Sequence, residues 1–169
     1  GKWPRMDAEL IAEHADGIIA TTGCPSGDVQ TRLRLGQYDA ALEAAAMWQD
    51  IYGKDNYFLE LMDHGLEIER KVKNDLLKLA KDLNLPLVAT NEPFFFCAED
   101  FDAHDALIAV ASNRLVSHED RRRLSPDHCL KTQDQMAALF ADLPEAIANT
   151  LVVAQRCAVM APSRKPILP

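Results

Sequence analysis

Three short apolar segments alternate with helix-forming segments early in the chain, and this alternation constrains the fold more than any other feature. The apolar segments are residues 17–23, 57–62 and 86–90. Their β-branched and aromatic residues favour strands. Strands that alternate with helices form parallel sheets, because each helix carries the chain back to the edge where the last strand began. We therefore predict an α/β fold in which about three parallel strands form a slice of a barrel or a small open sheet.

The predicted helices carry recognisable start signals and periodic patterns. Residues 38–51 are rich in alanine, and residues 67–83 have an apolar stripe opposite a row of lysines. Asp7 is expected to cap a short first helix, and Ser26 is expected to cap a helix over residues 28–35. These helices would connect the strands and cover them.

Only helices are predicted after the third strand. Residues 102–111 form the first of them, and Thr132 with Gln135 forms a capping box for a second. Pro144 is expected at the first turn of the last helix, which reaches about residue 157. Three prolines in residues 161–169 indicate an extended linker.

Composition limits the classes of function. The chain has 169 residues, of which 48% are hydrophobic, and a formal net charge of −8. An acidic chain of this kind does not bind nucleic acid by broad neutralisation of phosphates, although another domain could supply a basic surface. No apolar stretch is long enough to span a bilayer, so we expect no membrane contact. The four cysteines have no CxxC spacing, which favours reduced thiols in the cytoplasm.

The candidate site residues follow the ends of the first and third predicted strands. Cys24 lies in a turn that begins a helix, where a thiol can be a metal ligand or a nucleophile. The alternative is a buried thiol in a tight turn. Glu92 can bind a cation, or it can cap a helix or pair with a neighbouring Arg or Lys. Phe94 stands where a histidine would complete a chelating pair with Glu92, and a phenyl ring cannot ligate.

Other polar residues are interpreted mainly as structural. His64 follows the second strand and is expected to be an exposed turn residue, with a role as a base or as a hydrogen-bond donor that orients a site residue as the alternatives. His104 is expected to have a packing role on the helix after the third strand. Arg121, Arg122 and Arg123 are expected to be a solvated surface, with contact to phosphates or an acidic partner as the alternative.

Five linked segments resemble a known family. They are residues 22–27 (TGCPSG), 57–65 (YFLELMDHG), 87–91 (LVATN), 103–107 (AHDAL) and 139–145 (LFADLPE). In this order they closely resemble the PHP (polymerase and histidinol phosphatase) domain of bacterial DNA polymerase III alpha subunits. Several linked motifs are far more specific than any one of them.

The resemblance implies a distorted (β/α)7 barrel, of which this chain is the latter part. Residues 1–97 would form part of the barrel and residues 98–160 its helical remainder. Residues 161–169 would be a linker toward an absent polymerase palm. An early His-x-His pair and other ligands of the family would lie upstream of Gly1.

The resemblance also implies a degraded metal site. Family members with an intact site bind a cluster of ions (zinc, manganese or magnesium) at the carboxyl ends of the strands, and some are 3′–5′ exonucleases. Cys24 matches one family ligand, whereas the family's Asp-x-His pair falls on Glu92 and Phe94. Up to Thr90 the chain is similar to members that keep the site, and from Asn91 onward to members that have lost it. Either natural drift or a hybrid origin would give this pattern.

The expected function is therefore mainly structural, within the DNA replication machinery and with no catalytic residue in this chain. The alternative is a metal-dependent phosphoesterase or 3′–5′ exonuclease domain in the full-length parent. The implied partners are the rest of the polymerase alpha subunit, a proofreading exonuclease subunit, and DNA through other domains. The isolated chain is expected to self-associate, because strands cut from a barrel leave unpaired edges.

Overall fold

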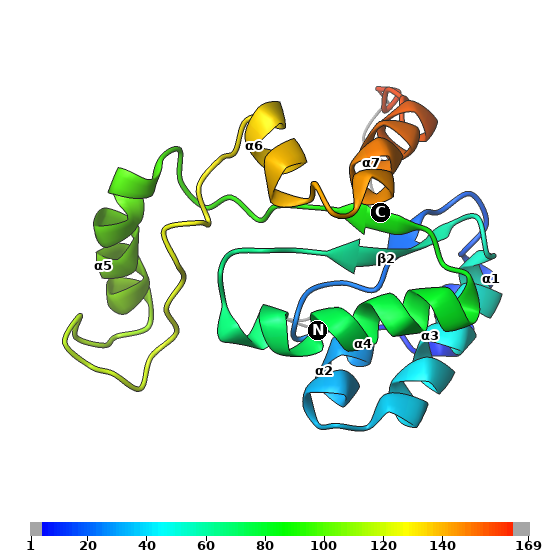
Figure 1. The fold of residues 1–169 in the computed structure, drawn as a ribbon, viewed down its shortest axis with the longest axis horizontal. Helices are drawn as coiled ribbons and strands as arrows, with labels where there is room; N and C mark the ends of the chain where they lie inside the picture. The colour runs from blue at the N-terminus through cyan, green and yellow to red at the C-terminus, as the bar shows by residue number, and fades with distance from the viewer. Residues whose placement is uncertain (1–4, 164–169) are drawn as a thin grey trace, which may run out of the picture.

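A three-stranded parallel sheet forms the centre of the computed structural model, which describes residues 5–163 (Figure 1). The central strand β2 pairs with β1 on one side and with β3 on the other. The strands are β1 (Ala20–Thr21), β2 (Tyr57–Leu61) and β3 (Leu87–Ala89). The predicted α/β fold with about three parallel strands is confirmed.

Helices connect the strands and cover the sheet. They are α1 (Ala8–Glu13), α2 (Asp28–Arg34), α3 (Tyr38–Tyr52), α4 (Glu67–Leu83), α5 (Phe101–Ala111), α6 (Gln133–Leu139) and α7 (Pro144–Arg156), with a 3-10 turn η1 (Ala98–Asp100) before α5. In Figure 1, α2, α3 and α4 lie on one side of the sheet, α7 packs against β3 on the other side, and α5 stands apart. No helix in residues 5–163 is both long enough and apolar enough to cross a membrane.

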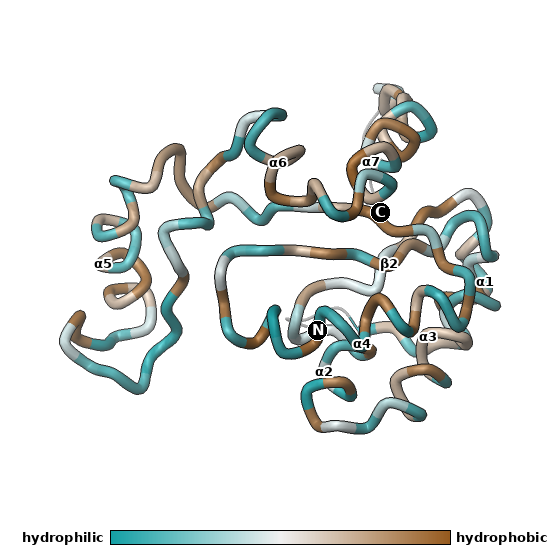
Figure 2. The backbone as a smooth tube through the Cα atoms, viewed as in Figure 1, coloured by the Kyte–Doolittle hydropathy of each residue, from teal (hydrophilic) through white to brown (hydrophobic). Residues whose placement is uncertain are grey.

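The hydrophobic core lies between β2 and the helices. Tyr57, Leu59 and Leu61 are buried there against apolar side chains of α2, α3 and α4. Phe58 and Glu60 alternate with them and are buried on the other face of the strand. Figure 2 shows the same contrast along α4, where hydrophobic and hydrophilic residues alternate around the helix. Both faces of β2 are therefore covered, as is usual for a central parallel strand.

Several predicted helix signals are confirmed. The Asp7 side chain accepts a hydrogen bond from the Leu10 backbone N–H at 2.9 Å and caps α1. Thr132 and Gln135 form the predicted capping box at the start of α6. Pro144 is the first residue of α7. Most of the predicted linker over residues 161–169 lies outside the described residues.

Two predictions around β1 are wrong. The strand has only two residues instead of seven, because only Ala20 and Thr21 are paired in register with β2. Ser26 does not cap α2, whose N-cap residue is Gly27. The Ser26 hydroxyl instead lies 3.0 Å from the Sγ atom of Cys24, which holds the turn closed.

A buried carboxylate joins the three strands on the face opposite the core. Glu60 of β2 is 8% exposed and accepts hydrogen bonds from the hydroxyls of Thr21 and Thr90, both at 2.6 Å. Its backbone N–H donates to the Thr22 hydroxyl at 3.0 Å. Because Thr21 belongs to β1 and Thr90 follows β3, one side chain connects all three strands.

An ion pair fixes the segment that follows α5. Asp105 of α5 accepts from the Arg121 guanidinium at 2.6 Å, and the two side chains are 5% and 1% exposed. Arg121 also donates to the Val116 carbonyl at 3.0 Å. The expected solvated surface is confirmed for Arg122 and Arg123 but wrong for Arg121, because Asp105 supplies a buried partner for its charge. The same guanidinium lowers the pKa of Asp105.

We predict that Glu60→Ala destabilises the protein by about 2–3 kcal/mol, because two threonine hydroxyls lose a charged acceptor. Urea unfolding followed by circular dichroism would measure the change. Glu43→Ala, an exposed carboxylate of α3, is the matched control and should change stability by less than about 0.5 kcal/mol. Equal unfolding midpoints for the two variants would contradict the structural role of Glu60.

Candidate functional site

The candidate residues lie where the three parallel strands end. Cys24, His64 and Glu92 each come three residues after the last residue of β1, β2 and β3, respectively. Because parallel strands end at one edge of a sheet, these three turns lie at the same edge. In barrel-like α/β proteins this edge is the usual place for chemistry.

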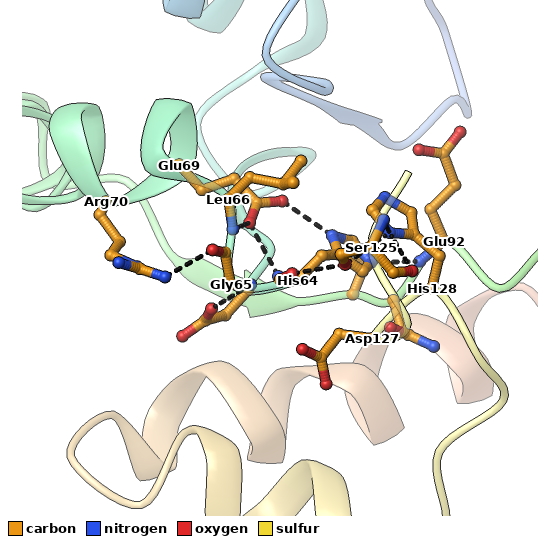
Figure 3. Close-up of polar contacts among 12 residues, drawn as sticks. His64, Gly65, Leu66, Glu69, Arg70, Glu92, Ser125, Asp127 and His128 are labelled. Atoms are coloured by element: carbon orange, nitrogen blue, oxygen red, sulfur yellow. Dashed lines mark hydrogen bonds and ion pairs between the residues drawn. The ribbon is translucent and has the colours of Figure 1, made fainter. Parts of the chain in front are cut away.

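His64 is the most deeply buried of the three side chains. It is 1% exposed, and its Nδ1 atom lies 2.7 Å from Oε1 of Glu69. Its Nε2 atom accepts a hydrogen bond from the Glu92 backbone N–H at 3.2 Å (Figure 3). Since Nε2 is an acceptor, the ring proton lies on Nδ1 and is donated to Glu69. The expected exposed turn residue is therefore wrong, because Glu69 provides a buried partner on the next helix.

The Glu69 carboxylate accepts hydrogen bonds from several polar groups of the turn between β2 and α4. Its Oε2 atom accepts from the backbone N–H groups of His64, at 2.7 Å, and Leu66, at 3.3 Å. Burial alone would raise the pKa of Glu69, but the hydrogen bonds from His64 and Leu66 outweigh burial and lower that pKa. Glu69 is thus an ionised carboxylate that orients His64.

His128 extends this cluster from a distant part of the chain. Its ring stacks on the ring of His64, with the centroids 4.0 Å apart and the planes 14° from parallel. The Ser125 backbone N–H donates to Nδ1 of His128 at 3.1 Å, and the Ser125 hydroxyl donates to the His64 carbonyl at 2.6 Å. Burial lowers the pKa of His128, and the neighbouring His64 adds to this effect. The His128 ring is therefore neutral around neutral pH.

Phe94 continues the column of rings. Its centroid lies 6.1 Å from that of His128 and 5.5 Å from that of His104. The Arg122 guanidinium lies over the Phe94 ring at 5.8 Å. His104 also packs against Phe95, at 5.3 Å, so its expected packing role is confirmed. The column connects the edge of the sheet to α5.

The two predicted ligands are not assembled into a metal centre of protein groups. The Cys24 thiol is partly buried beside the Ser26 hydroxyl, and the Glu92 side chain is exposed while its backbone holds His64. Within residues 5–163, no three or more His, Cys, Asp or Glu side chains are arranged to hold a metal ion. A weak or vestigial site at Cys24 and Glu92, completed by groups outside this chain, stays a prediction.

Both ring nitrogens of His64 already have partners within the protein. A general base must reach a substrate proton with a free nitrogen or oxygen. The Nε2 atom of His64 is already used by the Glu92 backbone, and its Nδ1 atom by Glu69. Sequence reasoning missed Glu69 and His128 as members of this cluster. The only available signal was the capping position of Glu69 at the start of α4.

Comparisons with known proteins find similar sequences among polymerase subunits. Residues 1–64 match the PHP domain. The chain is 52% identical over 157 residues to DNA polymerase III subunit alpha of Mycobacterium tuberculosis strain H37Rv, a match that covers 92% of the chain and 13% of that protein. It is 51% identical over 155 residues to the subunit of Saccharopolyspora erythraea, which covers 90% of the chain and 13% of that protein. It is 40% identical over 167 residues to the subunit of Treponema pallidum, which covers 98% of the chain and 14% of that protein. The chain thus spans only a small part of the length of these relatives.

The lowered pKa of His128 predicts a stability that falls as the solution is acidified. Below about pH 6.5, His128 takes up a proton more readily in the unfolded chain than in the folded chain. Acidification therefore stabilises the unfolded state relative to the folded state. Urea midpoints measured from about pH 7.5 to about pH 5.5 should therefore decrease. This range lies above the lowered pKa of Glu69, which stays ionised throughout.

Two variants separate His128 from other histidines. His128→Phe keeps a ring against His64 and should reduce the dependence of the midpoint on pH. His118→Gln changes an exposed histidine and should leave that dependence as it is. If His128→Phe and the unmodified protein lost stability equally on acidification, His128 would not be the cause of the pH dependence.

Proposed function

Since this chain belongs to the family of DNA polymerase III alpha subunits and carries PHP-domain sequence, we propose that it serves mainly as a structural part of a bacterial replicative DNA polymerase. Its proposed work is to support the polymerase fold and to provide a docking surface for a separate proofreading exonuclease subunit. In this proposal, contact with DNA is made through other parts of the longer protein.

The packing of Phe94 is the observation that supports this proposal best. By resemblance, Phe94 stands where metal-binding members have a ligand histidine. Its ring has no lone pair to offer a metal, and it packs against His128 and His104 under the Arg122 guanidinium. The Phe94 side chain is 40% exposed, so these contacts cover part of the ring. The position has a packing role in this chain.

The hydrogen bonds of the strand-end cluster give further support. Glu69, His64 and Ser125 satisfy one another and the adjacent backbone. A buried polar network in which the members are paired makes the local structure rigid and specific. Such a network suits a scaffold, whereas a reactive site needs groups that remain free for substrate.

Charge and cysteine chemistry are consistent with the proposed setting. With a net charge of −8, the chain is a poor surface for DNA, so the basic DNA-binding surface is assigned to other domains. The four cysteines are free thiols, which supports a reducing compartment, and we place the protein in the cytoplasm.

A metal-dependent phosphoesterase or exonuclease is the second candidate function. The position of Cys24 at the end of β1 favours it, because the thiol is retained at a family ligand position at the edge of the sheet. In this case zinc, manganese or magnesium would activate water and bind the phosphate. Cys24 and Glu92 would be two ligands of a site completed by residues outside this chain.

Metal analysis of the full-length protein separates the two functions. We predict that the dialysed, unmodified protein holds metal weakly, because the position of Phe94 offers no ligand atom. The double variant Glu92→Asp, Phe94→His should retain more zinc or manganese by mass spectrometry. Glu99→Asp with Phe96→His makes the same chemical changes at exposed positions and is the matched control. Tight binding of two or more ions by the unmodified protein would contradict the proposal that the role of this chain is mainly structural.

We also predict that the 169-residue chain alone forms oligomers. β1 lies at the end of the strand order, and Ile18 just before it is 47% exposed. An open edge next to an apolar side chain promotes pairing with a second copy. Light scattering should detect the oligomer, and Ile18→Lys should reduce it. A monomer at high concentration in the unmodified chain would contradict this expectation.

A further inference from the structure

A pocket of about 330 Å³ lies between α5 and the segment after it that contains Arg122 and Leu124, which we call the returning segment. One wall of the pocket is formed by His104, Ile108 and Ala111 of α5, which are spaced four and three positions apart and so share one face of the helix. The residues that define it are His104, Ile108 and Ala111 on α5, with Phe94, Arg122 and Leu124 opposite. This volume is at the small end of the range for ligand pockets and suits one large side chain.

Buried contacts hold the walls of the pocket in place. The ion pair of Asp105 and Arg121 joins α5 to the returning segment, with both side chains at most 5% exposed. Arg121 also donates to the Val116 carbonyl, which fixes the loop between them. The Phe94 wall is held by the Phe94 backbone N–H, which donates to the His128 carbonyl at 2.9 Å. The pocket is therefore formed before any ligand arrives.

The polar groups of the pocket suit a ligand that carries a negative charge. Arg122 is the one fully charged side chain among the lining residues, and it is exposed over the Phe94 ring. Within the described part of the chain, the buried Nδ1 atom of His104 has no hydrogen-bond partner. Buried polar atoms are normally paired, so this nitrogen is an unsatisfied polar group in the wall of the pocket.

The surface around the pocket favours a peptide over a small molecule. Leu107 and Val110 of α5 are 62% and 77% exposed, and Leu115 in the following loop is 63% exposed. A small ligand inside the pocket would leave these side chains in water. A peptide segment lying across α5 would cover them, and exposed apolar patches of this kind commonly mark protein-binding surfaces.

We propose that this pocket binds an acidic segment of a partner protein. One large apolar side chain of the segment enters the pocket between Ile108 and Phe94, and a neighbouring carboxylate pairs with Arg122. The site is separate from the strand-end cluster of His64, Glu69 and His128. It is also independent of the metal question, so the two proposals can fail separately.

Fluorescence anisotropy with the full-length protein that contains this region tests the proposal. The probe is a labelled hexapeptide with a central Leu-Phe pair flanked by two acidic residues on each side. The same peptide with lysines in place of the acidic residues is the charge control. We expect the acidic peptide to bind and the lysine peptide to bind at least about tenfold more weakly, because Arg122 attracts one charge and repels the other.

Three variants of the protein locate the binding. Ala111→Phe fills the pocket and should weaken binding by about tenfold or more. Arg122→Gln removes the charge and should weaken it by about three- to tenfold. Lys71→Gln removes an exposed charge on α4 and should leave the affinity unchanged. Circular dichroism and unfolding midpoints verify that each variant is folded.

Several outcomes would overturn the proposal. One is equal affinity of the three variants, and another is equal affinity for the acidic and lysine peptides. Absence of binding to the full-length protein would also refute it. If the isolated 169-residue chain bound the peptide while the full-length protein did not, the pocket would be filled by the rest of the same polypeptide rather than by a partner.

Discussion

The hydrogen bonds of His64 are the interaction on which the edge of the sheet depends. Through Nδ1 the ring is tied to Glu69 at the start of α4, and through Nε2 it holds the backbone of Glu92 after β3. One buried ring thus connects the ends of two neighbouring strands. The Ser125 hydroxyl donates to the His64 carbonyl and so joins the segment that follows α5 to the same turn. Because each polar atom of the ring has a partner, burial costs little, and the turn is fixed in one conformation.

These hydrogen bonds leave neither nitrogen of His64 free to act as a ligand or as a base. A ligand or a base must present a free lone pair, whereas His64 uses both of its nitrogens within the protein. Glu92 contributes its backbone to that arrangement while its carboxylate faces solvent. The ring column then continues from His128 to Phe94, which adds only packing. Chemistry at this edge would require ligands from the longer protein around Cys24.

The sequence predicted the periodic parts of the structure and missed the pairings between distant residues. Alternating strands and helices identified the parallel sheet, because periodicity is a local property that needs no knowledge of neighbours. Asp7 and Thr132 were recognised for the same reason, since a cap acts within one turn of helix. The burial of Arg121 depends on Asp105, and the stacking of His64 depends on His128 far along the chain. In both cases an ordinary exposed residue was expected, because the partner that makes burial favourable becomes visible only in three dimensions. The length of β1 was missed because it depends on which residues pair with β2, and only Ala20 and Thr21 do so.

Phe94 connects the two features that matter most for function. On one side its ring closes the column that begins at His64, and on the other it forms a wall of the pocket beside α5. A metal ion ties strand ends together by bonding to their side chains, and it needs several ligands with matched geometry. A phenyl ring can hold neighbouring segments together by packing alone, and here it contacts side chains as different as His104 and Arg122. Phe94 thus forms a hydrophobic junction between the end of the last strand and α5, and its ring is part of the wall of the pocket.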